Sequence, residues 1–249
     1  YLVAYCDSNT SCGSLLYLSG LPKRLTDGQK TLVEMFSKNV QIAFDNIMLT
    51  KDIEDTQREV IERLSQSTEG NEINEHYIFR TVKACRILGK ALGLDDIQLN
   101  LLTSAAPLHN VGNLCSPTRA LYKQDSLSPE DVQLIERHTE FGYQLLKGSN
   151  RPLIKVAAII AKEHHEYWNG QGYPDGLQGE NIHLYSRIVA VAVAYTILRS
   201  ETAENQAWSV QKTLEHMQAR SAIQFDPNIV AMLTDHIGKI EDDTLDWVR

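Results

Sequence analysis

Two adjacent histidines, His164 and His165, stand at the end of an apolar, helix-like run and are followed by a glycine-rich loop. Each neutral imidazole offers a nitrogen lone pair, so a histidine pair suits iron, zinc or manganese. Gly170 and Gly172 let the loop backbone adopt positive φ or approach a ligand closely, and Pro174 stiffens the exit. The stretch predicts a metal site. The alternative is a pair of surface histidines before an ordinary loop.

The segment His164-His165-Glu166 is followed after a short spacer by Gly170-Gln171-Gly172-Tyr173-Pro174. This pattern resembles the signature of the HD-GYP family. The resemblance continues through residues 176–182 and Arg187-Ile188. HD-GYP domains are bacterial, metal-dependent phosphodiesterases that act on cyclic di-GMP. The resemblance therefore implies a mainly α fold, an all-α domain of the HD superfamily, and a role in cyclic di-GMP signalling.

The resemblance also assigns metal-ligand positions along the chain. They fall on Glu72, His76, His109, His138, His164 and His165. A spacing of four places Glu72 and His76 on one helix face, as joint ligation requires. Family members hold two or three metals between helices, and these metals activate water and polarise the phosphate.

The loop after the histidine pair keeps the family's Gly-x-Gly-Tyr-Pro motif. It is the candidate for substrate binding and for contacts with a protein partner. By resemblance, the substrate-binding residues are Gly172, Tyr173, Pro174 and Arg187, the last as a phosphate contact. Cyclic di-GMP is therefore the small-molecule partner that the resemblance implies.

Two ligand carboxylates of the family are missing. The family's His-Asp-(Ile/Val)-Gly-Lys element begins with His109, but Asn110 and Asn113 replace its aspartate and lysine. In the family's Ala-Asp-x-x-Asp-Ala element, Val193 and Thr196 replace the aspartates. An aspartate bridges two cations through two anionic oxygens, whereas asparagine offers one neutral oxygen and valine offers none. We expect at most one divalent transition metal per chain (iron, zinc or manganese), or none.

These departures leave two main functional interpretations. The chain is either an active cyclic di-GMP phosphodiesterase with a reduced metal site or an impaired member that binds nucleotide or protein without hydrolysis. We favour the second, because the departures gather at charged or metal-facing positions while the scaffold motifs remain. A third interpretation is that the domain has a purely structural role and serves only for dimerisation.

Each candidate ligand also has a structural interpretation. Glu72 and His76 suit surface polar groups of a helix, and His109 and His138 suit hydrogen-bonded core histidines. Three further histidines match no ligand position of the family and are expected to be ordinary exposed residues. These are His183, His216 and His236.

Composition is that of a soluble globular protein. The 249 residues are 43% hydrophobic and 22% charged, with a net charge of −8 and no long basic tract, which argues against DNA or anionic-membrane binding. Four scattered cysteines without CxxC spacing favour reduced thiols and a cytoplasmic location. No apolar run of membrane-spanning length occurs in this fragment. Because the chain begins at Tyr1 without methionine, we expect it to be part of a longer protein.

Helical patterns must position the histidines. Expected helices cover about residues 72–92, 97–108, 128–141, 151–163, 185–198, 205–220 and 226–240. Ser128 and Asp226 are the expected N-caps of two of them, each followed by a proline at the first helical position. We assign residues 68–249 to the HD-GYP-like domain.

Upstream, two short β-prone runs at residues 1–6 and 14–18 predict strands, and residues 1–25 resemble the tail of a sensor-like α/β domain. Thr26 and Gln29 predict the start of a long helix, assigned to residues 26–67. Its apolar residues recur at steps of three and four, so we expect a signalling helix that forms a homodimer through residues 30–66. The alternative is an amphipathic helix packed on its own domain. Residues 39–46 also resemble linkers of two-component response regulators.

Overall fold

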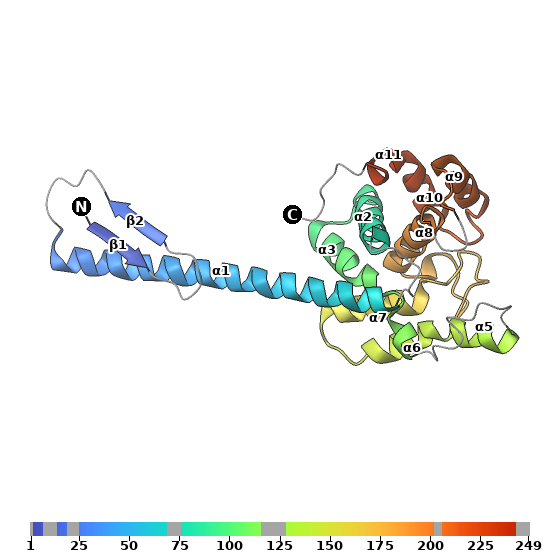
Figure 1. Cartoon of the computed structure of the whole chain (residues 1–249), viewed down its shortest axis with the longest axis horizontal. Helices are drawn as coiled ribbons and strands as arrows, with labels where there is room; N and C mark the ends of the chain where they lie inside the picture. Colours follow the sequence, from blue (N-terminus) through green and yellow to red (C-terminus); the bar gives the residue numbers. More distant parts are fainter. Residues whose placement is uncertain are drawn as a thin grey trace. The chain divides into compact units, whose positions relative to one another are not determined.

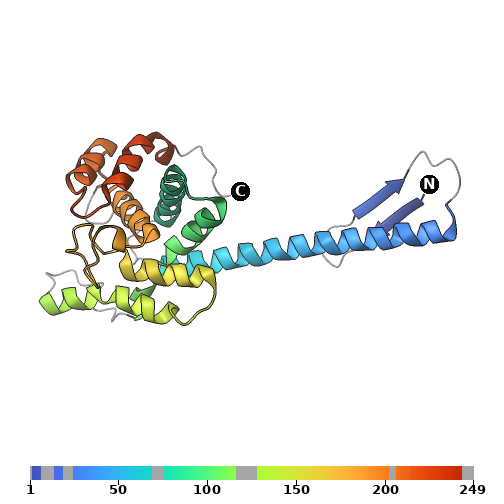
Figure 2. The same ribbon diagram turned by 180° about the vertical axis from the view of Figure 1, so that it is seen from behind.

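The computed structural model describes residues 2–6, 14–18, 25–68, 76–115, 128–201 and 206–242, with backbone alone for 2–6, 14–18 and His76 (Figures 1 and 2). The chain divides into two compact units, Tyr1–Glu59 and Val60–Arg249, which are considered one at a time.

The first unit contains a two-stranded sheet and most of a long helix. Strand β1, Leu2–Cys6, pairs antiparallel with β2, Ser14–Leu18, and Leu2 lies opposite Leu18. Both predicted strands are confirmed. Helix α1 covers Asp27–Thr68, 42 residues. Thr26 N–H donates to Gln29 Oε1 at 2.9 Å, and Gln29 N–H donates back to Thr26 Oγ1 at 3.4 Å. This reciprocal pair is the helix start that the sequence predicts.

The predicted apolar stripe of α1 is exposed along most of its length. Its large side chains keep between 41% and 67% of their surface accessible: Leu32, Phe36, Ile47, Ile53, Val60 and Leu64. Within the part of the chain that the structure describes, this stripe is therefore not covered by the protein's own residues.

The last turns of α1 belong to the second unit and are bonded to it. Ser65 Oγ donates to the carbonyl oxygen of Pro107 at 2.7 Å, and Asn113 Nδ2 donates to the carbonyl oxygen of Thr68 at 3.0 Å. Ser65 and Thr68 are buried, and Ile61 packs against the hydrophobic core. The end of α1 is thus attached to the two sides of the short segment that contains His109.

The second unit is helical. Its elements are α2 His76–Ala91, α3 Asp96–Ala105, η1 Ala106–Leu108, η2 Val111–Cys115, α5 Pro129–Glu136, α6 His138–Leu146, α7 Pro152–Glu163, η3 Gly179–Asn181, α8 Leu184–Leu198, α9 Val210–Ala219, α10 Pro227–Asp235 and α11 Ile237–Ile240. Helix α2 packs on α3 and α8, while α7 packs on α3, α6 and α8. The described residues of this unit form isolated bridges but no strand. The mainly α fold is confirmed.

Four of the predicted helices differ in extent from the observed ones. The helix expected over 97–108 is α3 only as far as Ala105 and continues as the 3-10 turn η1, which contains Pro107. The helix expected over 128–141 is interrupted at Arg137, next to the point where the His138 ring bonds the Ile135 carbonyl. The helix expected over 226–240 is interrupted at His236, whose ring bonds the Met232 carbonyl. Helix α9 begins only at Val210, with Ser209 as its N-cap. In two cases a histidine ring binds a backbone carbonyl at the break.

The predicted caps are confirmed. Ser128 accepts from Asp131 N–H and Asp226 accepts from Asn228 N–H, and each is followed by proline in the first helical turn. No helix among the described residues is both long enough and apolar enough to cross a membrane.

Candidate metal centre

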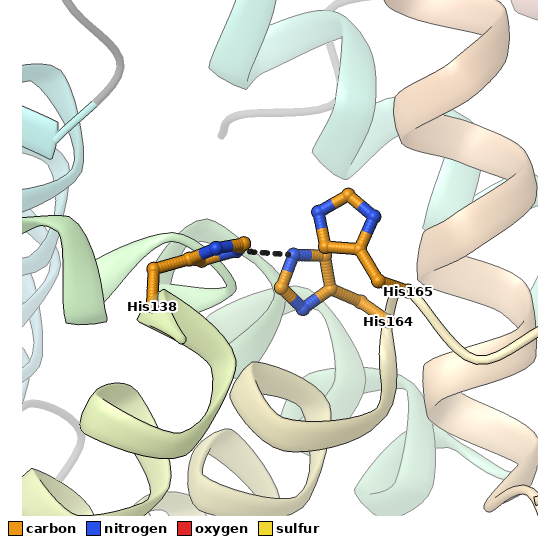
Figure 3. A group of neighbouring side chains, drawn as sticks. All are labelled: His138, His164 and His165. Atoms are coloured by element: carbon orange, nitrogen blue, oxygen red, sulfur yellow. Dashed lines mark hydrogen bonds between the residues drawn. The ribbon is translucent and has the colours of Figure 1, made fainter. Parts of the chain in front are cut away.

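Three histidines from the ends of two neighbouring helices meet in the second unit. His138 is the first residue of α6, His164 is the C-cap of α7, and His165 follows it. One ring nitrogen from each lies within 4.8 Å of the other two (Figure 3). We call these residues the histidine cluster. It can hold a metal ion, and the structure brings together three of the predicted ligands.

Backbone carbonyls fix the orientation of two cluster rings. His138 Nδ1 lies 2.6 Å from the Ile135 oxygen, and His164 Nδ1 lies 3.0 Å from the Ile160 oxygen. A carbonyl only accepts, so Nδ1 must carry the proton in both rings. In the neutral tautomers the lone pair is therefore on Nε2, the arrangement that metal-binding histidines adopt.

The two Nε2 atoms face each other. His138 Nε2 and His164 Nε2 are 3.4 Å apart, as the dashed line in Figure 3 indicates. Two lone pairs at this distance repel unless a proton or a cation lies between them. Two nitrogens bound to one tetrahedral zinc at about 2.0–2.1 Å lie about 3.3 Å apart. The donor set and its spacing therefore fit a transition metal.

Burial keeps the cluster neutral. Desolvation, with repulsion from the neighbouring histidines, lowers the pKa of His164 well below its ordinary value and lowers the pKa of His165 to about 3. Desolvation also lowers the pKa of His138, although its hydrogen bond to Ile135 opposes this. Neutral imidazoles at pH 7 are the form that binds metal, since protons do not compete for the lone pairs.

Glycines allow the ligand-bearing segments to approach one another. A Cβ at Gly112 would lie 1.8 Å from the His138 carbonyl oxygen. A Cβ at Gly172 would lie 2.2 Å from Tyr167 N and 2.4 Å from the His165 carbonyl oxygen. Both contacts involve backbone atoms, so any side chain here would displace the segments that carry the histidines.

The Gly-Tyr-Pro loop folds back on the histidine pair. Glu166, which is 3% exposed, accepts hydrogen bonds from Asp175 N–H at 2.7 Å and from Leu177 N–H at 2.9 Å. Tyr173 N–H donates to the His165 carbonyl at 3.2 Å, and the two rings stack with centroids 4.8 Å apart and planes at 20°. The loop is therefore attached at both its middle and its far end.

The other predicted ligands lie in different situations. His109 is buried, its Nδ1 bonds the Ala106 oxygen at 2.9 Å, and its ring centroid is 5.2 Å from that of His164. Glu72 and the His76 side chain lie outside the described residues. Asn110 is half-buried, and Val193 is a buried residue of α8.

Arg187, the predicted phosphate contact, is engaged within the protein. Its Nη1 donates to Asp226 Oδ2 at 2.5 Å and its Nε donates to the Ile182 oxygen at 2.9 Å. Asp226 is itself 4% exposed and caps α10. These contacts join α8 to α10, and a contact of Arg187 with phosphate stays a prediction.

The prediction of three ordinary exposed histidines is wrong. His183, His216 and His236 are all half-buried. His183 Nδ1 accepts from Tyr185 N–H at 3.2 Å as the N-cap of α8, and His216 packs edge-on against Trp208. Their half-burial follows from their positions at helix ends or against an aromatic side chain, which sequence periodicity does not reveal.

Two residues received no structural role from the sequence. Glu166 fastens the Gly-Tyr-Pro loop, and Asn113 bonds the end of α1. The signal for Glu166 was its place beside the histidine pair. For Asn113 there was none, because its partner is a backbone carbonyl 45 residues away.

The profile of the family described as "HD domain" matches residues 48–229, and the matched region includes the histidine cluster and the Gly-Tyr-Pro loop. The chain belongs to the HD-GYP family. A second profile, a domain of unknown function (DUF3369), matches residues 1–53.

Relatives of this HD-GYP chain carry phosphodiesterase names. The 3'3'-cGAMP-specific phosphodiesterase 2 of Vibrio cholerae is 31% identical over 225 residues, 90% of this chain and 43% of the relative. The cyclic di-GMP phosphodiesterase response regulator RpfG of Xanthomonas campestris is 35% identical over 183 residues, 73% of this chain and 48% of the relative. The chain thus spans about half the length of these relatives.

Two solved structures share the fold. A cyclic GMP-AMP specific phosphodiesterase of Vibrio cholerae (V-cGAP3) superimposes with a TM-score of 0.55 at 20% identity, over 74% of this chain and 48% of that one. An HDG"Y"P protein from Bdellovibrio bacteriovorus gives 0.51 at 25% identity, over 66% and 52%. At this identity the first comparison concerns fold alone.

Proposed function

We propose that this chain is an HD-GYP output domain of bacterial cyclic dinucleotide signalling in which hydrolysis is impaired and binding carries the function. The observation that supports this is the composition of the site. The histidine cluster is complete, but Asn110 and Val193 replace the two ligand carboxylates that the family would have there.

We propose that the site holds at most one divalent transition metal per chain. His138, His164 and His165 would hold it through neutral nitrogens, which favour zinc or iron. A metal so bound would polarise a phosphate oxygen and make a coordinated water more acidic. The chain's own residues then keep the three rings neutral and oriented, with His138 and His164 buried and His165 half-buried, and the loop after them covers one side of His165.

The electrostatic argument favours binding over catalysis. A two-metal mechanism needs anionic ligands that hold two cations about 3.5–4 Å apart. Three neutral imidazoles contribute no negative charge, so a second divalent cation would be repelled by the first without compensation. The second cation is also the one that would stabilise a leaving oxygen.

The ligand of the proposed site is a cyclic dinucleotide. Relatives are named for cyclic di-GMP and for 3'3'-cGAMP, so both are candidates. Gly172, Tyr173, Pro174 and Arg187 are the proposed contacts. The same Gly-Tyr-Pro loop is the proposed surface for a protein partner.

Metal analysis and a hydrolysis assay test the proposal together. Protein purified without chelator should contain at most one equivalent of metal, bind a labelled cyclic dinucleotide in equilibrium dialysis, and release little or no linear product. A His138→Ala variant should lose the metal. Rapid turnover by the wild type that His165→Ala abolishes would assign the chain to active phosphodiesterases instead, an alternative that the names of its relatives favour.

We also propose that the chain acts as a homodimer through residues 30–66. The support is the exposure of the apolar stripe on α1, whose six large members keep at least 41% of their surface accessible. Such a stripe is typical of a coiled-coil seam. The proposed location is the cytoplasm.

A further inference from the structure

The cluster rings are oriented in two different ways. His138 and His164 each place Nδ1 against a backbone carbonyl, and so does the neighbouring His109. For His165 the described residues provide no such hydrogen bond to the ring. Its ring instead stacks on Tyr173, with centroids 4.8 Å apart and an interplanar angle of 20°.

The stack is held from both sides. On one side, His165 follows directly after the end of α7 and its carbonyl oxygen accepts from Tyr173 N–H at 3.2 Å. On the other side, the buried Glu166 carboxylate binds two loop amides beyond Pro174. Gly172 leaves no room for a side chain between the loop and the backbone at residues 165–167. The Tyr173 ring is therefore held against the His165 imidazole.

We infer that Tyr173 is a positioning residue for the metal centre, and that its aromatic face orients the His165 ring toward His138 and His164. This inference rests on the metal site of the proposed function. It gives the tyrosine of the Gly-Tyr-Pro motif a role besides substrate contact. The role belongs to the ring, because the stack uses the ring face and not the hydroxyl.

The physical reason lies in the freedom of an imidazole without an anchored Nδ1. A histidine ring rotates about two side-chain torsions, and a metal ligand must be held in one orientation to bind tightly. Outer-shell partners of metal-bound histidines change metal affinity by about 10–100-fold when removed. A stacked aromatic ring supplies the restraint that a carbonyl supplies for the other two ligands.

The test is a zinc titration of the metal-free full chain against a chromophoric chelator. Tyr173→Leu removes the ring face and should weaken zinc binding about 10-fold or more. Tyr173→Phe keeps the ring and should retain the wild-type affinity. Tyr143→Leu is the matched control, since Tyr143 is also half-buried but lies beside Lys147 and Lys162, and it should leave zinc affinity unchanged.

A second measurement separates this inference from the proposed function. In the metal-free protein, the ring protons of His165, assigned by their loss in His165→Gln, should show an upfield ring-current shift in NMR spectra. The shift should persist in Tyr173→Phe and disappear in Tyr173→Leu. A wild type that shows the shift but binds no zinc would overturn the proposed metal site while retaining the orienting contact.

Two results would overturn the positioning role itself. One is a Tyr173→Leu variant that binds zinc as tightly as the wild type. The other is a Tyr173→Phe variant that binds as weakly as Tyr173→Leu, which would assign the effect to the hydroxyl.

Discussion

Charge at individual ligand positions decides how many metals this site can hold. Asn110 and Val193 stand where the family has aspartates, and the described cluster is made of neutral imidazoles. A carboxylate adds both an oxygen donor and a negative charge. Two adjacent cations require the negative charge, because it offsets their mutual repulsion. Restoring the anions is therefore the most direct test of the proposed impairment.

We expect Asn110→Asp combined with Val193→Asp to raise the metal content above that of the wild type. Val193 is 9% exposed, so an aspartate there is costly to bury unless a cation pairs with it. The melting temperature of the double variant should consequently depend on added metal more strongly than that of the wild type. Metal analysis and thermal unfolding with and without chelator measure both effects.

Asn100→Asp, the same substitution at an exposed position of α3, is the control and should change neither quantity. Unchanged metal content in the double variant would contradict the charge argument.

The neutral histidines also predict a pH dependence. The pKa of His165 is lowered to about 3 in the folded chain, while an unfolded histidine titrates near pH 6.5. Between these values only the unfolded chain takes up the proton, so stability falls as pH falls through this window, by about 1.4 kcal/mol per pH unit for each such proton.

His165→Gln should therefore show a shallower loss of stability than the wild type when metal-free protein is unfolded in urea at about pH 7 and about pH 5. Asn100→Ala, at an exposed position of α3, removes no titratable group and should keep the wild-type dependence. Equal slopes for the wild type and His165→Gln would mean that folding does not lower the pKa of His165.

The three histidines of the cluster were predicted as metal ligands from residue types and motif order alone, because the family motif lies in short continuous segments. The structure brings them together, and their role as ligands stays a prediction. The orientation of their rings was not predictable, since it depends on backbone carbonyls at helix ends and on the stack with Tyr173. The roles of Glu166 and Asn113 were missed for the same reason: each binds backbone atoms, whose positions leave no trace in side-chain patterns.

At the scale of elements, close contact between segments is what assembles the site. Element η2 lies against the start of α6, and Gly112 is the point of contact. We expect Gly112→Ala to lower the free energy of unfolding by at least about 2 kcal/mol, because its Cβ would meet backbone atoms that cannot rotate away. Urea unfolding measures the loss.

Gly238→Ala is the matched control, since a Cβ there meets nothing within 4 Å. In helix α11 this change should stabilise the protein by about 0.5–1 kcal/mol. Similar free energies of unfolding for the two variants would show that η2 and α6 are not in the contact described.

Helix boundaries were predicted correctly where the capping contacts are local. Two predictions were wrong where a histidine ring binds a backbone carbonyl inside the expected helix. Ser128 and Asp226 bond amides within three residues, so the sequence contains the whole motif. The breaks at Arg137 and His236 occur where imidazoles bind carbonyls of the preceding turn, and hydrophobic periodicity does not report such side-chain bonds to the backbone.

At the scale of the whole molecule, the mainly α class followed from helical periodicity and the family motif, and the long helix from the absence of glycine and proline after Gly28. Whether the chain is a monomer or a dimer was not predictable from the sequence, because an apolar stripe serves equally for packing within a chain or between chains. The exposure of the stripe on α1 favours packing between chains.

We expect a dimer in light scattering at high micromolar concentration, and a monomer when Phe36→Glu and Ile47→Glu are combined. Both side chains are exposed members of the stripe, and two charges at a seam repel their copies. Lys38→Glu, an exposed position on the opposite face of α1, should remain dimeric. A monomeric wild type would contradict the proposed dimer.

The two hydrogen bonds from the end of α1 have a thermodynamic consequence. Ser65 binds the carbonyl of Pro107 and Asn113 binds that of Thr68, so the helix end and the segment containing His109 share interactions. Coupling of this kind is reciprocal: whatever the state of the helix end does to ligand affinity at the site, the ligand does to the helix end in equal measure. The amides of residues 61–68 should therefore exchange with solvent at a different rate once the site is filled, so hydrogen exchange in this helix end would report occupancy of the site.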